Sequence, residues 1–138
     1  MVEEIKKCFI ERSNEYELKY DYNYWDSHVK YVVKRAVELA KTNNANLAIV
    51  EISANSHDLA KVFEEREEES HNLVGSELAV QLLSNKKYNK EKIEKVRKCI
   101  LYHGRDLNSV SLTKEEWCAR NADILSMFDN ITIFFHNI

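Results

Sequence analysis

Hydrophobic positions recur along much of the chain at the three-and-four-residue spacing that places side chains on one face of an α-helix. The clearest stretch runs from about Tyr24 to Thr42 and ends in the polar sequence TNNAN. The next stretch, from about Ala45 to Ala60, carries apolar side chains around much of its circumference. An apolar surface on all sides is typical of a helix surrounded by others. We therefore predict that this second helix lies at the centre of the fold.

The second half of the chain predicts three further helices. Residues His71 to Leu83 keep helical spacing, and after SNKKYN the apolar residues of 93–100 do so again. A last helix begins at Thr113, because Thr113 and Glu116 have the spacing of a capping box. Helical spacing continues in this helix at six positions: Trp117, Asn121, Ile124, Leu125, Phe128 and Ile131.

Two segments without a helical period separate these helices. Residues 61–70 are highly charged, and residues 104–112 begin with Gly104, which suits a helix end. The tail sequence ITIFFH has strand propensity, but no partner strand is predicted, so we assign it to the end of the last helix. The pattern thus predicts an all-α fold: one compact bundle of five to six helices over residues 1–138, with its core at about 24–131.

Composition agrees with a soluble helical protein. The chain has no proline and two glycines, and it combines 44% hydrophobic with 31% charged residues. A net charge of −3 argues against a nucleic-acid duplex as partner. No apolar run is long enough for a signal sequence or a membrane span, so we expect a cytoplasmic protein without a membrane partner. A homodimer is compatible with a domain of this size.

Several titratable side chains lie on the apolar stripes of the predicted helices or at their ends. They are His28, His57, Asp58, His71, His103 and Asp123. A single histidine on an apolar face is usually a hydrogen-bonded core residue. Gathered in one low-dielectric region, however, the set needs a partner that neutralises and organises it, and a divalent metal does both. Imidazole and carboxylate without thiolate suit Mn²⁺, Fe²⁺, Ni²⁺, Co²⁺ or Zn²⁺, with Mg²⁺ as a further candidate.

The adjacent residues His57 and Asp58 need a particular backbone to act together. In the middle of a helix their side chains would point about 100° apart. At a helix end the backbone can turn both toward the same ion. The predicted helix ends near these residues, so we expect the pair to converge.

The order of these residues resembles the H…HD…D signature of the HD-domain superfamily of metal-dependent phosphohydrolases. His28 lies in WDSHVKYVVKRA, the doublet His57-Asp58 in ANSHDLAK, and Asp123 in NADILSMFDNI, so the similarity spans about residues 24–131. The resemblance implies that these four residues bind one metal ion. It also implies that His71 and His103, in HNLVGSELAVQLL and VRKCILYHG, line the pocket or hold a second ion bridged by Asp58.

The chain departs from the family pattern near two of the ligands. Many relatives continue the doublet with an apolar residue and glycine, whereas this chain has Leu59-Ala60. Relatives often read DADRLDA around the last aspartate, and here Asn121, Ile124 and Ser126 replace the first Asp, the Arg and the later Asp. The ligand itself is kept, and the changes concern its support and substrate contacts.

The implied chemistry is hydrolysis of a phosphate ester or anhydride. A bound divalent ion lowers the pKa of a water molecule toward neutrality, and the resulting hydroxide attacks phosphorus beside Asp58. Lys61 and Arg105 could neutralise substrate phosphate, or they could be ordinary solvated charges. In EEREEE, residues 64–69, the functional hypothesis is that crowding of like charges would raise one carboxyl pKa, so that Glu64 or Glu65 could protonate a leaving group. The alternative is a solvated loop.

We therefore expect a phosphohydrolase whose substrate is a nucleotide or a similar small phosphorylated metabolite. One alternative keeps the fold and metal but makes the protein a nucleotide sensor without turnover, which the altered NADILS segment would favour. Another is a metal-free helical interaction domain whose histidines pack in the core. A di-iron oxygenase ranks lower, because nothing in the sequence indicates a large organic substrate pocket.

Overall fold

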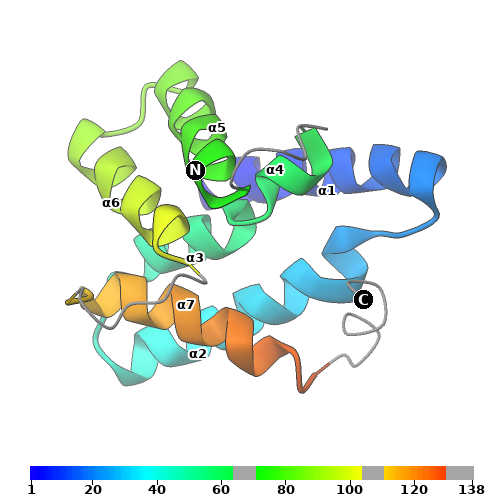
Figure 1. Cartoon of the computed structure of the whole chain (residues 1–138). Coiled ribbons are helices and arrows are strands. Elements are labelled where there is room, and N and C mark those ends of the chain that lie inside the picture. The colour runs from blue at the N-terminus through cyan, green and yellow to red at the C-terminus, as the bar shows by residue number, and fades with distance from the viewer. Residues whose placement is uncertain (64–70, 104–110, 130–138) are drawn as a thin grey trace.

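The computed structural model describes residues 1–63, 71–103 and 111–129, and every regular element within these ranges is helical (Figure 1). The all-α prediction is thus confirmed. In chain order the elements are α1 Val2–Tyr20, η1 Trp25–Val29, α2 Lys30–Thr42, α3 Leu47–Ser56, α4 Leu59–Phe63, α5 His71–Asn85, α6 Lys90–Leu101 and α7 Lys114–Ser126. Within the described ranges, no helix has the combined length and apolar character that crossing a membrane requires.

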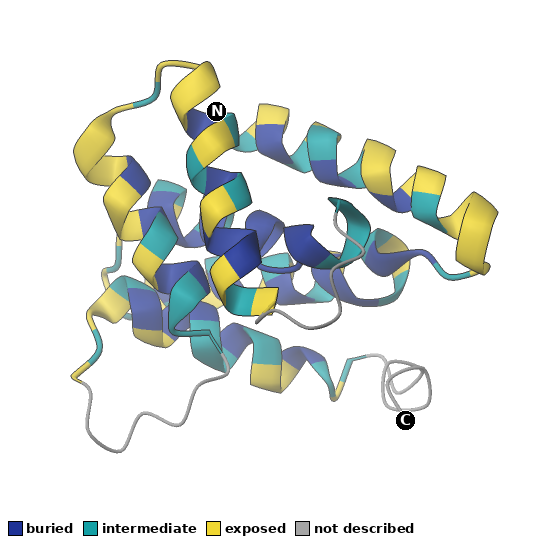
Figure 2. Ribbon diagram, turned by 45° about the horizontal axis from the view of Figure 1, so that its top comes forward, coloured by how far each residue is buried: buried dark blue, intermediate teal, exposed yellow. Residues whose placement is uncertain are grey.

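Helix α3 lies at the centre of the bundle, as predicted. Its start is fixed by Asn46, whose side-chain oxygen accepts a hydrogen bond from the Ile49 amide at 3.1 Å. Ile49, Val50 and Ile52 are completely buried, because α1, α2, α6 and α7 pack around this helix. Figure 2 shows the same contrast, with a buried centre and exposed residues on the outer sides of α1, α5 and α6.

Helices α2 and α7 form one closely packed pair. Small side chains face each other across it, since Ala36 and Ala40 of α2 belong to one core cluster with Cys118 and Ala122 of α7. The pair is also joined at its end, where the Arg35 guanidinium donates hydrogen bonds of 2.8 and 2.7 Å to the Asp129 carboxylate. The capping box predicted at the start of α7 is present.

The buried face of α7 is not the face with its large apolar residues. Small or polar residues are buried instead, among them Cys118, Ala122 and Ser126. Four large apolar side chains of this region are exposed by 38–82%: Trp117, Ile124, Leu125 and Phe128. The reason is the close approach of α2, which leaves room only for small side chains between the helices. The helix ends at Ser126, and residues 130–138, which carry the tail assigned to it, lie outside the described residues.

The structure differs from the sequence-based expectation in two places. Helix α1 was not predicted, yet Ile5 and Phe9 are fully buried against the rest of the core. Charged residues surround Ile5 and Phe9 in the sequence, so their four-residue spacing does not by itself indicate a helix. The loop predicted at 61–70 is wrong at its start, because residues 61–63 belong to α4. Residues 64–70 lie outside the described ranges.

Candidate metal centre

The doublet His57-Asp58 occupies a turn between two helices. Helix α3 ends at Ser56 and α4 begins at Leu59, so the chain changes direction at these two residues. Both side chains then face one point, and His57 Nε2 lies 3.1 Å from Asp58 Oδ2. The other ring nitrogen, Nδ1, donates a hydrogen bond of 2.7 Å to the Ala54 carbonyl. Since Nδ1 carries the proton in this bond, the neutral ring presents a free lone pair at Nε2 to the centre.

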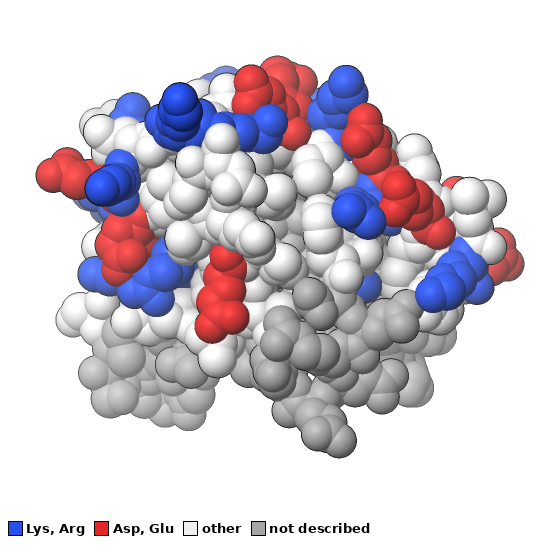
Figure 3. Space-filling view, turned by 90° about the horizontal axis from the view of Figure 1, so that it is seen from above, with Lys and Arg blue, Asp and Glu red and all other residues white. Residues whose placement is uncertain are grey.

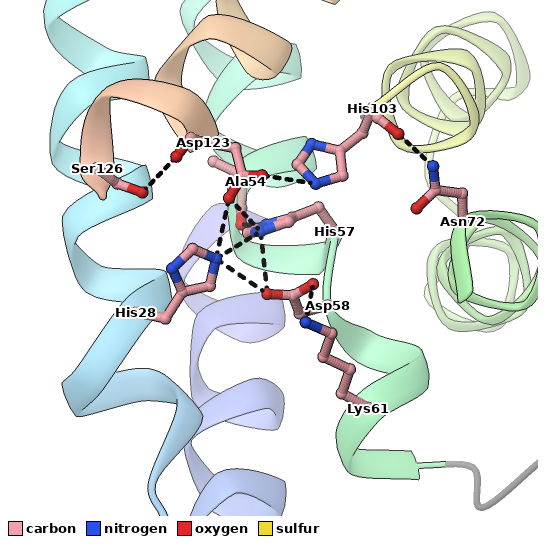
Figure 4. A network of polar contacts seen from close by, with 9 residues as sticks. All are labelled: His28, Ala54, His57, Asp58, Lys61, Asn72, His103, Asp123 and Ser126. Carbon is pink, nitrogen blue, oxygen red and sulfur yellow. Dashed lines mark hydrogen bonds and ion pairs between the residues drawn. The ribbon is translucent and has the colours of Figure 1, made fainter. Parts of the chain in front are cut away.

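His28 reaches the same point from η1, a single π-helical turn. Its Nε2 atom lies 2.9 Å from Asp123 Oδ1, 3.2 Å from Asp58 Oδ2 and 3.4 Å from His57 Nε2 (Figure 4). A π-turn contains more residues than an α-turn and so rotates the side chains that precede it relative to those that follow. This rotation lets consecutive residues His28 and Val29 both be buried, at 5% and 0% exposure.

Asp123 of α7 closes the centre and connects it to a third imidazole. Its Oδ1 atom faces His28 and lies 3.5 Å from His57 Nε2, while its Oδ2 atom lies 3.0 Å from His103 Nε2. The His103 backbone carbonyl accepts a hydrogen bond from the Asn72 side chain of α5. Asp123 is therefore the carboxylate that contacts imidazoles through both oxygens, whereas the second oxygen of Asp58 faces Lys61 at 3.8 Å.

The charges at this centre stabilise one another. Burial disfavours the charged His57 imidazole, but Asp58 and Asp123 raise its pKa to about 10. Burial also opposes ionisation of Asp58, but His57 and Lys61 hold its pKa well below its usual range. The pKa of Asp123 is likewise depressed despite burial, because His103, His28 and His57 contact its carboxylate. Without a bound metal ion, the protonated imidazoles and the Lys61 ammonium supply the positive charge.

A divalent ion fits this arrangement. The two imidazole nitrogens His28 Nε2 and His57 Nε2 lie 3.4 Å apart, and each lies 2.9 to 3.5 Å from Asp58 Oδ2 and Asp123 Oδ1. Ligands bonded at about 2.1 Å to one ion would lie about 3.0–3.4 Å from each other in octahedral or tetrahedral geometry. Asp58 Oδ2 and Asp123 Oδ1 are also buried without a well-formed hydrogen bond. Such buried oxygens call for a partner, and an ion would provide one.

Comparison with known sequences gives the family. A sequence model described as the HD domain matches residues 25–127, most of the chain. The chain belongs to the HD-domain family. Among solved structures, the chain is similar to a predicted HD superfamily hydrolase from an uncultured Thermotogales bacterium, with 25% sequence identity and a TM-score of 0.73. That similarity covers 91% of this chain and 67% of the other. No curated protein matches the chain significantly.

The structure brings together most, but not all, of the HD-domain residues that the sequence analysis selected. His28, His57 and Asp58 form one group of ligating atoms, and His57, His103 and Asp123 form another. His71 is exposed at the start of α5 and belongs to neither group. Its neighbour Asn72 contacts the centre instead, through His103. On a helix, adjacent residues point about 100° apart, so His71 and Asn72 face different surroundings.

The remaining selected residues lie close to the centre or outside the described ranges. Lys61 is close, at 3.8 Å from Asp58 Oδ1. Glu64, Glu65 and Arg105 fall in residues 64–70 and 104–110, which the structure does not describe. Two further residues near the centre were not predicted from the sequence: Asn72, and Tyr24, whose ring lies under the Lys61 ammonium. Neither residue type in isolation marks a site, so only the fold could reveal them.

The three residues of α7 that depart from the family pattern lie in different surroundings. The Asn121 side chain donates a hydrogen bond to the Trp117 carbonyl of its own helix. Ile124 is 46% exposed. Ser126 donates to the Asp123 backbone carbonyl at 2.6 Å and so supports the helix turn that carries the ligand. These changes leave the four converging donor atoms in place.

Proposed function

We propose that this HD-domain protein is a metal-dependent phosphohydrolase that cleaves a phosphate ester or anhydride of a nucleotide or a similar small phosphorylated metabolite. The observation that carries the proposal is the convergence of donor atoms from His28, His57, Asp58 and Asp123 at 2.9–3.5 Å. A site with two imidazoles and two carboxylates suits a catalytic divalent ion better than a structural zinc.

The residues of the centre have separate roles in this proposal. A divalent ion, when bound, supplies activation of water and polarisation of a phosphoryl oxygen. Asp58 and Asp123 provide the negative charge that holds such an ion in a buried place. The Ala54 carbonyl holds the His57 ring in the tautomer that can ligate, since it accepts the Nδ1 proton. His103 orients Asp123 through the second carboxylate oxygen, or provides a ligand at a second position.

Charge near the centre and over the surface favours a small anionic substrate. Lys61 lies beside the ligands with its side chain 24% exposed, where it can meet a phosphoryl group. On the face seen in Figure 3, by contrast, Lys and Arg alternate with Asp and Glu and form no continuous basic surface. A long polyanion needs clustered cations along its path. A single phosphorylated metabolite needs only the local cation.

The experiment that tests the proposal measures bound metal and hydrolysis together. Wild-type protein, Asp58→Ala and the control Asp26→Ala, which alters an exposed aspartate near His28, are soaked in Mn²⁺ and desalted. Their metal content is then determined, and phosphate release is assayed over a panel of nucleotides and phosphorylated metabolites.

We expect wild type and Asp26→Ala to retain one or two ions per chain and to hydrolyse at least one substrate, and Asp58→Ala to lose both properties. Wild-type protein that retains no metal would contradict the proposal and favour a helical binding domain. Bound metal with saturable nucleotide binding but no turnover would favour the sensor alternative.

A further inference from the structure

The Lys61 ammonium needs more than its acidic neighbour to stay beside the centre. Its nitrogen lies 3.8 Å from Asp58 Oδ1. This separation exceeds the 2.7–2.9 Å of a charge-assisted hydrogen bond, so the ion pair alone holds the ammonium loosely. A lysine side chain is also long and flexible, and it spans many rotamers unless other groups contact it.

Tyr24 provides such a contact. The Lys61 nitrogen lies 5.4 Å from the centroid of the Tyr24 ring, within the range of a cation–π interaction. Tyr24 is only 6% exposed, and this burial strengthens the attraction because water is largely excluded from the ring. Tyr24 lies four positions before the ligand His28, so the Tyr24 ring and the His28 imidazole come from adjacent turns of the chain.

Helix α1 holds the Tyr24 ring in place. Tyr16 of α1 contacts it edge-on, with ring centroids 5.1 Å apart and planes at 63°, and Tyr22 contacts it with centroids 4.9 Å apart. Edge-to-face contacts of this kind fix the orientation of an aromatic ring. Both Tyr16 and Tyr24 precede residues 25–127, the part of the chain that matches the HD domain. The support of Lys61 therefore comes from outside the matched region.

We propose that Tyr24 is a positioning residue that, held by Tyr16 of α1, keeps the Lys61 ammonium beside the metal centre, where it binds the phosphoryl group of the substrate. The binding role rests on the proposed function, whereas the placement of Lys61 rests on the geometry alone. The test therefore needs one measurement that involves metal and phosphate and another that involves neither.

The first measurement follows the lysine directly. Lysines of metal-free protein are ¹³C-methylated, and the Lys61 signal is assigned by its loss in Lys61→Arg. A ring beneath the ammonium shifts this signal upfield. We expect the shift in wild type and in Tyr24→Phe, which keeps the ring, and its loss in Tyr24→Leu. An unchanged Lys61 signal in folded Tyr24→Leu would overturn the proposed placement.

The second measurement is the affinity of the Mn²⁺-loaded protein for inorganic phosphate. We expect Tyr24→Leu to weaken phosphate binding about fivefold, with Mn²⁺ affinity and the phosphate affinity of Tyr24→Phe unchanged. In a Lys61→Met background, Tyr24→Leu should cause no further loss. An equal loss in that background would overturn the proposal, because the effect would not pass through Lys61.

Two further results have defined meanings. If Tyr24→Leu does not fold, Tyr16→Leu replaces it, and a smaller loss of both the upfield shift and the phosphate affinity is expected; no change in either would overturn the role of α1. If wild-type protein binds neither Mn²⁺ nor phosphate, the phosphate role fails together with the proposed function. The methyl signals then still decide whether Tyr24 places Lys61.

Discussion

At the scale of single residues, the centre concentrates opposite charges in a place where water is scarce. Asp58 Oδ2 and Asp123 Oδ1 are buried, and imidazole nitrogens are their nearest charged neighbours. In metal-free protein the protons on these rings take the role that a divalent ion would have. Removal of metal and change of pH should thus act on the same set of groups.

The stability of metal-free protein should depend on pH through these groups. The folded-state pKa of His57, about 10, exceeds its ordinary 6.5, so its stabilising contribution is full below pH 6.5 and is lost as pH rises toward 10. The pKa values of Asp58 and Asp123 lie below their ordinary 3.8, so their contribution is present above pH 3.8 and is lost as pH falls. We expect the urea midpoint, measured with a chelator, to be highest between these two ordinary values.

The control for this prediction is Asp58→Asn, which removes the neighbouring carboxylate that raises the His57 pKa. This variant should be less stable overall, and its urea midpoint should decline less between pH 6.5 and about pH 9 than that of wild type. A wild-type midpoint that increases across the same interval would contradict the assignment.

The two histidines beyond the doublet should differ in their effect on metal binding. His103 contacts Asp123 Oδ2 at 3.0 Å, while His71 is exposed. Whether His103 ligates or orients a ligand, its loss should weaken binding by at least about tenfold. We expect calorimetric titration with Mn²⁺ to show this loss for His103→Ala and no change for His71→Ala. Equal losses in both variants would mean that α5 presents His71 to the centre after all.

At the scale of elements, the close approach of α5 to the doublet turn fixes the position of His57. An added Cβ at Gly75 would lie 3.4 Å from the His57 carbonyl oxygen, 3.6 Å from Ile100 and 3.9 Å from the Ala60 amide. These are ordinary contact distances for one methyl group, and they leave no room for a larger side chain. The turn is therefore packed directly against the backbone of α5.

Substitution at Gly75 should have opposite effects for small and large side chains. Gly75→Ala should increase the free energy of unfolding by up to about 1 kcal/mol, because glycine is the poorer helix former and the methyl group fits. Gly75→Leu should destabilise the protein and weaken Mn²⁺ binding, since α5 must move away from the turn. Chemical denaturation and metal titration of both variants check this, and a destabilised alanine variant would show that the space is smaller than described.

Helices with regularly spaced large apolar residues could be predicted from the sequence. Features that depend on the packing of neighbouring helices could not. Spacing alone predicted α2, α3, α5 and α6, and the capping box predicted the start of α7. The exposed stripe on α7 shows the limit, because Trp117 and Phe128 keep helical spacing on the side away from α2. Only the small residues of α2 determine which side of α7 is buried.

The residues of the candidate site likewise divide into those that could be selected from the sequence and those that could not. The ordered residues His28, His57, Asp58 and Asp123 were selected from the sequence, since ligand types on apolar stripes are visible there. The contribution of Tyr24 was not visible, because it depends on a contact with Lys61 that only the folded chain makes. The choice between His71 and Asn72 depends on the exact rotation of α5, and periodicity does not fix a helix to within one residue.

At the scale of the whole molecule, one centre joins segments far apart in the chain. His28 comes from η1, the doublet from the turn after α3, His103 from the end of α6 and Asp123 from α7. An ion held by these residues would bind the folded chain and not the unfolded one. Metal and fold should therefore stabilise each other.

Thermal unfolding should reveal this coupling. At a free Mn²⁺ concentration about 100 times the dissociation constant, binding adds about 2.7 kcal/mol, which corresponds to roughly 10 °C in Tm for a chain of this length. We expect this increase in wild type, its reversal by chelator, and no increase in Asp58→Ala. A Tm that Mn²⁺ leaves unchanged in wild type would contradict metal binding by the native state.

The π-turn of η1 affects how the chain would respond to the deletion of a residue. Because such a turn holds an extra residue, deletion of one residue before His28 would let the segment relax to an ordinary α-helix without any shift of α2. Residues on both sides of the turn would keep their places, because the extra residue of a π-turn bulges out of the helix and its removal restores the regular helix. A single codon gained or lost could thus create or remove this turn while the H…HD…D residues and the rest of the fold stay in place, so the turn is a simple route by which HD domains with the same ligands could diverge around the first of them.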